Sequence, residues 1–229
     1  MKSRQETILQ IVLIAAFLLF LAYIVPNFLD KEAQARHLGD PTDVTALVLK
    51  ETLLGHDRPE RGAASARYTL VYFGDFECPT CAKAQPILDD LLRKRPDLKL
   101  IYRHFPHTMQ HPHAMLGALA AEAARAQNKF WKLADLLYTM QEDWTQAENT
   151  EAALTALAEM AGLDADRFTA DLHAGEGSPA AARIQEDMRA AESCSVELTP
   201  SFFLISPTHT WAAVGPVGLE RLRDAKFWQ

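Results

Sequence analysis

A short cysteine motif restricts the folds open to this chain more than any other feature. Cys78 and Cys81 are separated by two residues, after an apolar run at residues 70–73 and before a stretch with apolar residues at helical spacing. One sulfur of such a motif lies at a helix N-terminus, where unpaired N–H groups and the helix dipole stabilise a thiolate. Because the thiolate is the form that attacks disulfides, the motif predicts a redox centre.

The residues alone leave two other uses of this pair open. Two cysteines at this spacing can form half of a zinc site, but a four-ligand site needs partners, and the remaining cysteine, Cys194, stands alone. A purely structural disulfide would close so short a loop that it would stabilise the fold little. The context favours redox chemistry over both uses, and we expect no metal and no other cofactor.

The elements around the motif predict an α/β fold. Residues 67–73 and 98–105 have the composition of buried strands, and residues 79–95 carry an apolar face at helical spacing. A strand, a helix and a second strand of this length form a right-handed crossover with two parallel strands. The remaining predicted elements are a helical block at about residues 112–192, strands at 201–205 and 211–214, and a closing helix at 219–227.

The boundaries of the domain rest on weaker patterns. Residues 44–49 form an apolar run that predicts a short edge strand, and residues 55–67 lack periodicity, which predicts a loop. Thr145 and Glu148 match a capping box, which predicts a helix start at that point. We expect one domain, residues 43–229, to contain all of these elements.

Composition supports a folded core and excludes one class of partner. The chain has 229 residues, of which 48% are hydrophobic, enough for one domain to bury most of its apolar surface. Its formal net charge is -7. An acidic chain repels phosphate backbones and anionic lipid head groups, so we expect no nucleic-acid partner.

The N-terminal region predicts a membrane anchor. Residues 7–29 contain no charged residue, and a helix of this length spans the ~30 Å hydrocarbon core of a bilayer. We therefore expect a cytoplasmic tail at residues 1–6, a transmembrane signal anchor at residues 7–29 and a polar tether at residues 30–42. A cleaved export signal is the alternative, because residues 33–35 have the A-x-A form of a cleavage site, although they lie beyond the apolar run.

Charges beside the span orient it only weakly. Lys2 and Arg4 precede the span, and Lys31 and Arg36 follow it, so the positive-inside bias is slight. The short tail most simply stays in the cytoplasm while the larger domain is exported. In a bacterium this places a single-pass protein in the inner membrane, with its domain in the periplasm or outside, where disulfides persist.

The ordered motifs resemble those of the DsbA-like thioredoxin superfamily. The resemblance is closest to the branch described as DsbA-family or thioredoxin-like proteins, which are also found fused to some sodium/proton antiporters. It covers about residues 65–225. The stretches that carry it, besides the cysteine motif, are residues 73–78 (FGDFEC), 102–106 (YRHFP), 111–114 (HPHA) and 199–203 (TPSFF). It implies a thioredoxin fold with an α-helical insertion, here preceded by one N-terminal transmembrane helix.

The same resemblance implies catalytic roles. Cys78 would be the exposed nucleophile, and the more buried Cys81 would resolve the mixed disulfide, the two forming a redox-active disulfide. Pro79 and Thr80 would belong to the active-site loop. The other residues of this loop would be Thr199 and Pro200, with Pro200 in the cis form and the Thr199 backbone pairing with the substrate chain.

The implied function is that of a thiol–disulfide oxidoreductase. We expect a membrane-anchored, extracytoplasmic disulfide oxidase whose partners are exported polypeptides with thiols or disulfides and a membrane redox partner that recycles the cysteine pair. A periplasmic disulfide reductase for cytochrome or metal-centre assembly is one alternative. A non-catalytic thioredoxin-like module that binds peptide or copper is another.

Several positions depart from the family pattern or carry other hypotheses. Many thioredoxin-fold enzymes have a buried carboxylate six residues before the first cysteine, where this chain has Tyr72. Asp75 and Glu77 could take part in proton transfer, but we expect them in a solvated loop. We expect Cys194 to be a small buried residue that closes a helix rather than a third redox thiol or an interchain bond. The residues expected to serve structural or capping roles rather than to bind metal are His104, His107, His111 and His113.

Overall fold

The computed structural model describes residues 13–14, 17, 20, 42–44, 47–175 and 177–229. By its internal contacts the chain divides into two units, residues 1–38 and residues 39–229. Most of the predicted tail, anchor and tether lies outside the described residues. Within the anchor, Leu13, Ile14, Phe17 and Phe20 are described, and they are helical and exposed. In the described part of the chain, no helix has the length and apolar character needed to span a membrane.

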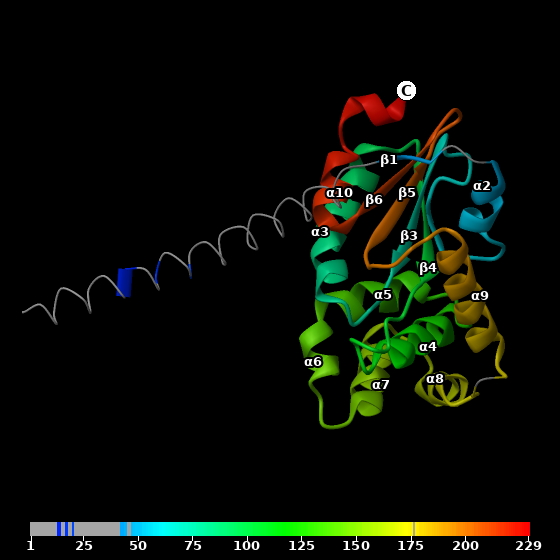
Figure 1. The fold of residues 1–229 in the computed structure, drawn as a ribbon. Helices are drawn as coiled ribbons and strands as arrows, with labels where there is room; N and C mark the ends of the chain where they lie inside the picture. Colours follow the sequence, from blue (N-terminus) through cyan, green and yellow to red (C-terminus); the bar gives the residue numbers. More distant parts are fainter. Residues whose placement is uncertain (1–12, 15–16, 18–19, 21–41, 45–46, 176) are drawn as a thin grey trace, which may run out of the picture. The chain divides into compact units, whose positions relative to one another are not determined.

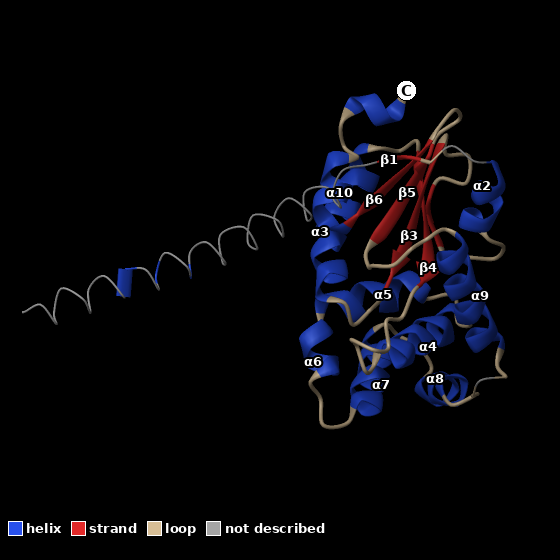
Figure 2. Cartoon of the chain, in the orientation of Figure 1, coloured by secondary structure: helices blue, strands red, loops and turns tan. Residues whose placement is uncertain are grey.

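One mixed β-sheet lies at the centre of residues 39–229 (Figure 2). Its strands, among the described residues, are β1 (Thr42–Asp43), β2 (Glu60–Gly62), β3 (Tyr68–Gly74), β4 (Leu98–His104), β5 (Ser201–Ile205) and β6 (Thr210–Val214). Their order across the sheet is β1-β6-β5-β3-β4-β2. The pair β3 and β4 is parallel, and the other neighbouring pairs are antiparallel. The parallel pair confirms the predicted strand–helix–strand unit.

Helices cover both faces of this sheet (Figure 1). The helices are α2 (Leu47–Leu54), α3 (Pro79–Lys94), α4 (Ala114–Arg125), α5 (Phe130–Thr139), α6 (Gln141–Thr145), α7 (Thr150–Met160), α8 (Ala165–Leu172), α9 (Pro179–Ser193), α10 (Gly215–Arg221) and the 3-10 helix η1 (Ala225–Trp228). Helices α4 to α9 lie between β4 and β5 in the chain, which confirms the predicted helical insertion into an α/β fold. The predicted closing helix divides into α10 and η1.

The sheet separates two apolar cores. Successive side chains of a strand point to opposite faces. Leu70 and Tyr72 of β3 belong to the larger core, to which α3, α10 and the insertion also contribute. Val71 and Phe73 belong to the smaller core, to which α2 and α9 contribute. Figure 1 shows α3 and α10 on one side of the sheet and α2 and α9 on the other.

Buried ion pairs attach α9 to the sheet. The carboxylate of Asp187 on α9 is fully buried; its Oδ1 accepts hydrogen bonds from Arg58 and Arg103, the former at 2.6 Å, and its Oδ2 accepts one from the backbone N–H of His104 at 2.8 Å. Glu122 on α4 pairs with Arg183 on α9, Oε2 to Nε at 2.6 Å. These five groups, which we name the α9 ionic seam, are the side chains of Arg58, Arg103, Glu122, Arg183 and Asp187.

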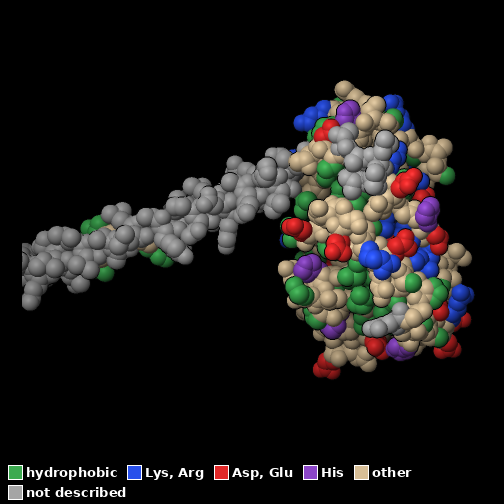
Figure 3. Space-filling view, turned by 45° about the vertical axis from the view of Figure 1, so that its right-hand side comes forward, with side chains coloured by type: hydrophobic (Ala, Val, Ile, Leu, Met, Phe, Trp, Pro, Cys, Tyr) green, Lys and Arg blue, Asp and Glu red, His purple; other side chains and the backbone are tan. Residues whose placement is uncertain are grey.

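On the surface, charges of both signs are interspersed. The face seen in Figure 3 shows acidic, basic and histidine side chains among hydrophobic ones over residues 39–229. Neither sign forms a continuous patch on that face. A mixed surface of this kind has no strong local field to attract a highly charged partner there.

Two boundary predictions are wrong. The edge strand predicted at residues 44–49 is replaced by β1 at residues 42–43 and by α2 from residue 47 onward, residues 45–46 lying outside the described part. A short apolar run fits a strand or a helix equally well, and here Leu53 turns into the core while Lys50 and Glu51 face solvent. The loop predicted at residues 55–67 contains β2, which pairs with β4 in antiparallel register.

The predicted capping box is also wrong. Helix α7 begins at Thr150, and its cap is Asn149, whose side chain accepts a hydrogen bond from the N–H of Ala152 at 3.0 Å. Thr145 instead ends α6, where its hydroxyl donates to the carbonyl of Gln141 at 2.8 Å. Asparagine caps a helix as well as threonine does, so the motif alone could not select between the two starts.

Candidate active site at the start of helix α3

The two cysteines of the motif lie at the N-terminus of α3. Cys78 is the residue before the first helical position, which Pro79 occupies, and Cys81 lies in the first turn. Proline suits that first position, because its missing N–H would have no partner within the helix. Cys78, Cys81 and Cys194 are free thiols in this structure. Cys78 is 4% exposed and Cys81 0%, so the expectation of an exposed Cys78 is wrong for this dithiol form, although Cys81 is the more buried.

The loop before β5 covers the first cysteine. The Sγ of Cys78 lies 3.6 Å from the carbonyl oxygen of Thr199, and the Thr80 hydroxyl lies 2.9 Å from that Sγ. The same hydroxyl lies 3.1 Å from the Thr199 carbonyl, and its single hydrogen points to that oxygen or, when Cys78 is a thiolate, to the sulfur. The peptide bond between Thr199 and Pro200 is cis, which confirms the expected isomer, and the Pro200 carbonyl accepts from the N–H of Gly215 at 2.8 Å. The predicted site residues therefore meet at one point.

The surroundings of Cys78 stabilise its thiolate. A hydrogen bond from the Cys81 thiol is the largest influence on the pKa of Cys78, burial opposes it, and hydrogen bonds from Thr199 and Thr80 add to it. Together they lower this pKa from 9.0 to about 5. The N-terminal end of the α3 dipole acts in the same direction. At neutral pH Cys78 is therefore a thiolate, the nucleophilic form of the side chain.

Cys81 has the opposite character. Burial is the main influence that raises the pKa of Cys81 well above 9.0, and its neighbour Cys78 raises the pKa further. A hydrogen bond with Tyr72 and one with the Asp75 backbone act to lower it. The pair thus consists of a thiolate at Cys78 and a thiol at Cys81 that donates to it, which is a suitable arrangement for two successive thiol–disulfide exchanges.

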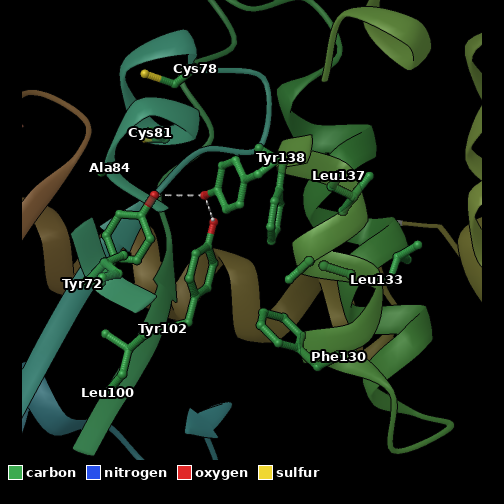
Figure 4. Close-up of a cluster of buried hydrophobic side chains, with 14 of the residues drawn as sticks. Tyr72, Cys78, Cys81, Ala84, Leu100, Tyr102, Phe130, Leu133, Leu137 and Tyr138 are labelled. Carbon is green, nitrogen blue, oxygen red and sulfur yellow. Dashed lines mark hydrogen bonds between the residues drawn. The ribbon is translucent and has the colours of Figure 1, made fainter. Parts of the chain in front are cut away.

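Three tyrosines lie beneath Cys81, and we name them the tyrosine layer. The hydroxyl of Tyr138 lies 2.9 Å from that of Tyr72 and 3.1 Å from that of Tyr102 (Figure 4). All three side chains are buried, and burial is the main reason why each tyrosine has a pKa well above 10.0. The layer is therefore a chain of neutral hydroxyls.

A glycine makes room for this layer. Gly74 follows Tyr72 by two residues on β3, so both face the same core. A Cβ at position 74 would lie 2.7 Å from the Tyr72 ring and 2.9 Å from the hydroxyl of Tyr102. Contacts that short do not occur in folded proteins, so a side chain at this position would displace the tyrosines.

The acidic residues of the motif do not lie in a solvated loop. Asp75 is 2% exposed, and it accepts hydrogen bonds from the ring of His111 at 2.7 Å and from the N–H of His107 at 3.0 Å. Glu77 is partly buried and accepts from the N–H of His113. Burial is the main cause that raises the pKa of Glu77. The expectation of solvation is therefore wrong, because both carboxylates fasten the segment after β4 to the cysteine motif.

The four histidines that raised the question of a metal lie among other partners. His104 is buried, with Nε2 at 3.2 Å from Oε1 of Glu122, and His111 pairs with Asp75. His113 directly precedes α4. Within the described residues, no three side chains of the types that bind metals form a group suited to an ion.

Cys194 lies away from the cysteine pair. It follows the last residue of α9 and packs, partly buried, against the smaller core. Cys78 and Cys81 belong to the larger core, on the other face of the sheet. This position fits a small residue that closes a helix, as expected.

Sequence reasoning missed three residues of this site. Gln141 donates from Nε2 to the carbonyls of Phe76 at 2.7 Å and Cys78 at 3.1 Å, and it thereby holds the backbone of the motif. Tyr102 could have been found, because it is the register partner of Tyr72 on the parallel strand and so shares its face. Tyr138 and Gln141 come from the helical insertion, and no local pattern connects them to the motif.

Comparisons with known proteins agree with this architecture. A thioredoxin family model matches residues 56–211. The chain is similar to the Na(+)/H(+) antiporter NhaA 3 of Salinispora tropica, with 39% identity over 165 residues that cover 72% of this chain and 24% of the antiporter. It spans about a quarter of the length of the curated relatives it matches.

Solved structures show the same fold. A thioredoxin-like oxidoreductase from Silicibacter pomeroyi DSS-3 matches with a TM-score of 0.64 and 26% identity, over 78% of this chain and 95% of that one. The thiol-disulfide exchange protein alpha-DsbA2 from Wolbachia pipientis matches with a TM-score of 0.64 and 17% identity, over 77% and 89% of the two chains. The chain therefore belongs to the thioredoxin family, and its fold is the one seen in this thioredoxin-like oxidoreductase and in the Wolbachia thiol-disulfide exchange protein.

Proposed function

We propose that this protein is a membrane-anchored, extracytoplasmic thiol–disulfide oxidoreductase that oxidises the thiols of exported polypeptides. The observation that carries the proposal is the contrast between Cys78, whose pKa is lowered to about 5, and the buried Cys81, whose pKa is raised. The DsbA-like fold around the pair supports it. Residues 7–29, which carry no charge, are the proposed anchor.

The stabilised thiolate favours oxidation of the substrate over its reduction. A fall in the pKa of Cys78 from 9.0 to about 5 stabilises the reduced pair at pH 7 by about a factor of 100. For a two-electron couple, a factor of 100 raises the reduction potential by ~60 mV. A disulfide with a higher potential accepts electrons from substrate thiols more readily, so this shift supports the oxidase direction.

The proposed reaction consists of two exchanges at Cys78. A substrate thiolate attacks the Cys78 sulfur of the Cys78–Cys81 disulfide, the bond between the cysteines breaks, and Cys81 leaves as a thiolate. A second substrate thiolate then attacks the substrate sulfur of the mixed disulfide, and Cys78 leaves as a thiolate. The substrate loses two electrons and two protons, the enzyme disulfide takes up the electrons, Cys81 takes up one proton, and the other proton passes to solvent.

The loop at Thr199 and Pro200 has a proposed role in holding the substrate. Its backbone lies against Cys78, with the Thr199 carbonyl 3.6 Å from the sulfur. An extended substrate segment whose cysteine is joined to Cys78 would run along this loop and pair with the Thr199 backbone. Main-chain pairing of this kind is independent of the substrate sequence, which suits an enzyme that acts on many exported chains.

A membrane redox partner is the proposed source of oxidising equivalents. Each turnover leaves the cysteine pair reduced, so another disulfide or an electron acceptor must reoxidise it. The proposed anchor would keep the domain near partners in the same membrane.

The reduction potential of the full chain tests this function. We would equilibrate the Cys194→Ser variant, in mild detergent, with glutathione buffers and follow the Cys78–Cys81 disulfide. A potential above about -180 mV supports an oxidase. A potential near or below about -250 mV contradicts that direction and favours a reductase. If the Cys78–Cys81 pair does not equilibrate with glutathione, the result contradicts the proposal that the protein is an oxidoreductase and favours a non-catalytic binding module.

A further inference from the structure

The direction of the hydrogen bonds in the tyrosine layer points to a use for it. Each phenol has one hydrogen to donate. Among the described residues, the Tyr102 hydroxyl has one hydrogen-bond partner, the Tyr138 hydroxyl at 3.1 Å, so its hydrogen points there. The hydrogen of Tyr138 then points to Tyr72, 2.9 Å away. The chain of donors therefore runs from Tyr102 through Tyr138 to Tyr72.

The hydrogen of Tyr72 is left for an acceptor at the cysteine end. The other group near its hydroxyl is Nε2 of Gln85 at 3.4 Å, an amide nitrogen that donates and does not accept. Cys81 has no exposure to water, and a hydrogen bond from Tyr72 is among the influences that lower the pKa of Cys81. In Figure 4 the three hydroxyls lie beneath the turn of α3 that carries Cys81.

We propose that Tyr72, oriented by Tyr138 and Tyr102, is a positioning residue that donates a hydrogen bond to the sulfur of Cys81 and stabilises this sulfur whenever it becomes a thiolate during exchange. The inference rests on the proposed function, because it concerns the step in which the Cys78–Cys81 disulfide opens. When a thiolate attacks Cys78, the electron pair of the broken S–S bond moves to Cys81, which water cannot reach. A donor already aimed at that atom needs no rearrangement as the charge forms.

The layer acts as a donor and not as a base. Its phenols are protonated at neutral pH, because burial keeps the pKa of each tyrosine well above 10.0. The proton that Cys81 gains after exchange therefore originates outside the layer. When the pair is reduced, the same chain of donors ends, through Cys81, on the Cys78 thiolate, so it also supports that charge.

Replacement of tyrosine by phenylalanine tests the proposal. Tyr72→Phe keeps the ring, which stacks on Phe202, and removes the hydroxyl. In the full chain carrying Cys194→Ser, we expect dithiothreitol to reduce the Cys78–Cys81 disulfide at least about tenfold more slowly, since a hydrogen bond to a charged group is lost. Tyr138→Phe should slow the reaction less, because the Tyr72 hydroxyl remains. The pKa of Cys78, followed by the ultraviolet absorbance of its thiolate, should rise in Tyr72→Phe.

Tyr68→Phe is the matched control. Tyr68 is buried on the same strand, and its hydroxyl donates to the carbonyl of Trp228, away from the cysteines. This control should match the wild-type rate. The proposal is overturned if folded Tyr72→Phe matches the wild-type rate, or if Tyr68→Phe slows the reaction as much. Should Tyr72→Phe fail to fold, a wild-type rate in Tyr138→Phe overturns it, and a slower rate supports it.

A second assay separates this proposal from the function on which it rests. Oxidation of reduced, unfolded ribonuclease A by the wild-type chain tests the oxidase function. If wild-type protein reacts with dithiothreitol but not with ribonuclease, the oxidase function fails while the rate ratio between wild type and Tyr72→Phe still decides the role of Tyr72.

Discussion

The tyrosine layer and the α9 ionic seam solve the same problem, buried polarity, in opposite ways. Beneath the cysteines, three hydroxyls bond one another and stay neutral. Along α9, charged groups meet, and the fully buried Asp187 accepts from two guanidinium groups and a backbone N–H. One network is built from dipoles, and the other from permanent charges.

The difference follows from what each region has to tolerate. A buried charge is costly unless it is always paired, so the seam is suited to permanent attachment of α9 to the sheet. A permanent charge beside Cys81 would shift its pKa at every stage of the reaction. A neutral donor forms a strong hydrogen bond to the sulfur only when the sulfur is a thiolate. The layer therefore suits a site where a cysteine is charged during one step and neutral during the next. Substitutions in the seam should therefore change stability, and substitutions around the cysteines should change thiol chemistry.

The largest expected effect comes from the centre of the seam. Asp187→Asn keeps the shape of the side chain and leaves Arg58 and Arg103 without their shared anion. We expect the free energy of unfolding to fall by about 3–5 kcal/mol, as measured by urea titration. Glu186→Gln is the control, since that partner of Arg58 is half exposed, and it should cost less than about 1 kcal/mol. A loss below about 1 kcal/mol in Asp187→Asn, or an altered Cys78 reactivity, would break the proposed division.

Acid should weaken the seam through Glu122. Burial alone would raise the pKa of Glu122, but the hydrogen bond and charge of His104 and the charge of Arg183 outweigh it and lower this pKa from 4.5 to about 2. A lowered folded-state pKa gives stability that is present above the unfolded-state value, near pH 4.5, and is lost as the pH falls toward 2. The loss should reach ~3 kcal/mol.

Unfolding at pH 7 and at pH 3 checks this expectation. Glu122→Gln should lower the free energy of unfolding at pH 7 and lower it less at pH 3. The reason is that the ionised wild-type carboxylate contributes less stability at pH 3 than at pH 7. Glu151→Gln is the control, since Glu151 also pairs with a histidine, His173, but is exposed. An equal cost of Glu122→Gln at both pH values would contradict the assignment.

On the cysteine side, removal of one hydroxyl should alter chemistry and spare stability. Thr80→Val removes the hydroxyl that lies 2.9 Å from the Cys78 sulfur. We expect the pKa of Cys78 to rise by up to about one unit, measured by the pH dependence of alkylation of the reduced protein. Thr139→Val removes an exposed hydroxyl bonded to the Asp135 carbonyl and should leave this pKa unchanged. An unchanged pKa in Thr80→Val would show that the Thr80 hydroxyl does not stabilise the thiolate.

The smallest effect should come from Cys194. It lies on the face of the sheet opposite the cysteine pair, so Cys194→Ser should leave the rate of disulfide reduction within about twofold of wild type. Its cost in unfolding free energy should stay below about 1 kcal/mol, because the side chain is only partly buried. A strongly altered rate would mean that a change on one face of the sheet affects the cysteine pair on the other. It would then weaken the division between the tyrosine layer and the α9 ionic seam.

The parts of the fold that the sequence predicts well are those with an uninterrupted pattern. Strands β3 and β4 and helix α3 were predicted within about two residues, since long apolar runs and an amphipathic helix tolerate few alternatives. The edges were not. Helix α2 and strand β2 are short, and tertiary packing rather than local preference decides what such segments become.

The site divides in the same manner. The cysteine pair and the loop at Thr199 and Pro200 are carried by motifs, so their meeting was predictable. The burial of Asp75 was missed because its partners, His107 and His111, follow β4, and only the folded chain returns them to the motif. Tyr138 reaches the layer from the insertion, where nothing in its own segment marks it.

Gly74, Tyr72 and Tyr102 should constrain one another during evolution. A side chain at position 74 would overlap the rings of both tyrosines, so a substitution of Gly74 is compatible with the fold only if the tyrosines are also replaced. In a lineage that loses the layer, the constraint on Gly74 is lifted, and in one that keeps it, the glycine is indispensable. The pattern of a tyrosine and a glycine two residues apart, just before the cysteines, is thus a marker by which genomes can be searched for thioredoxin-fold proteins that use phenols at this depth.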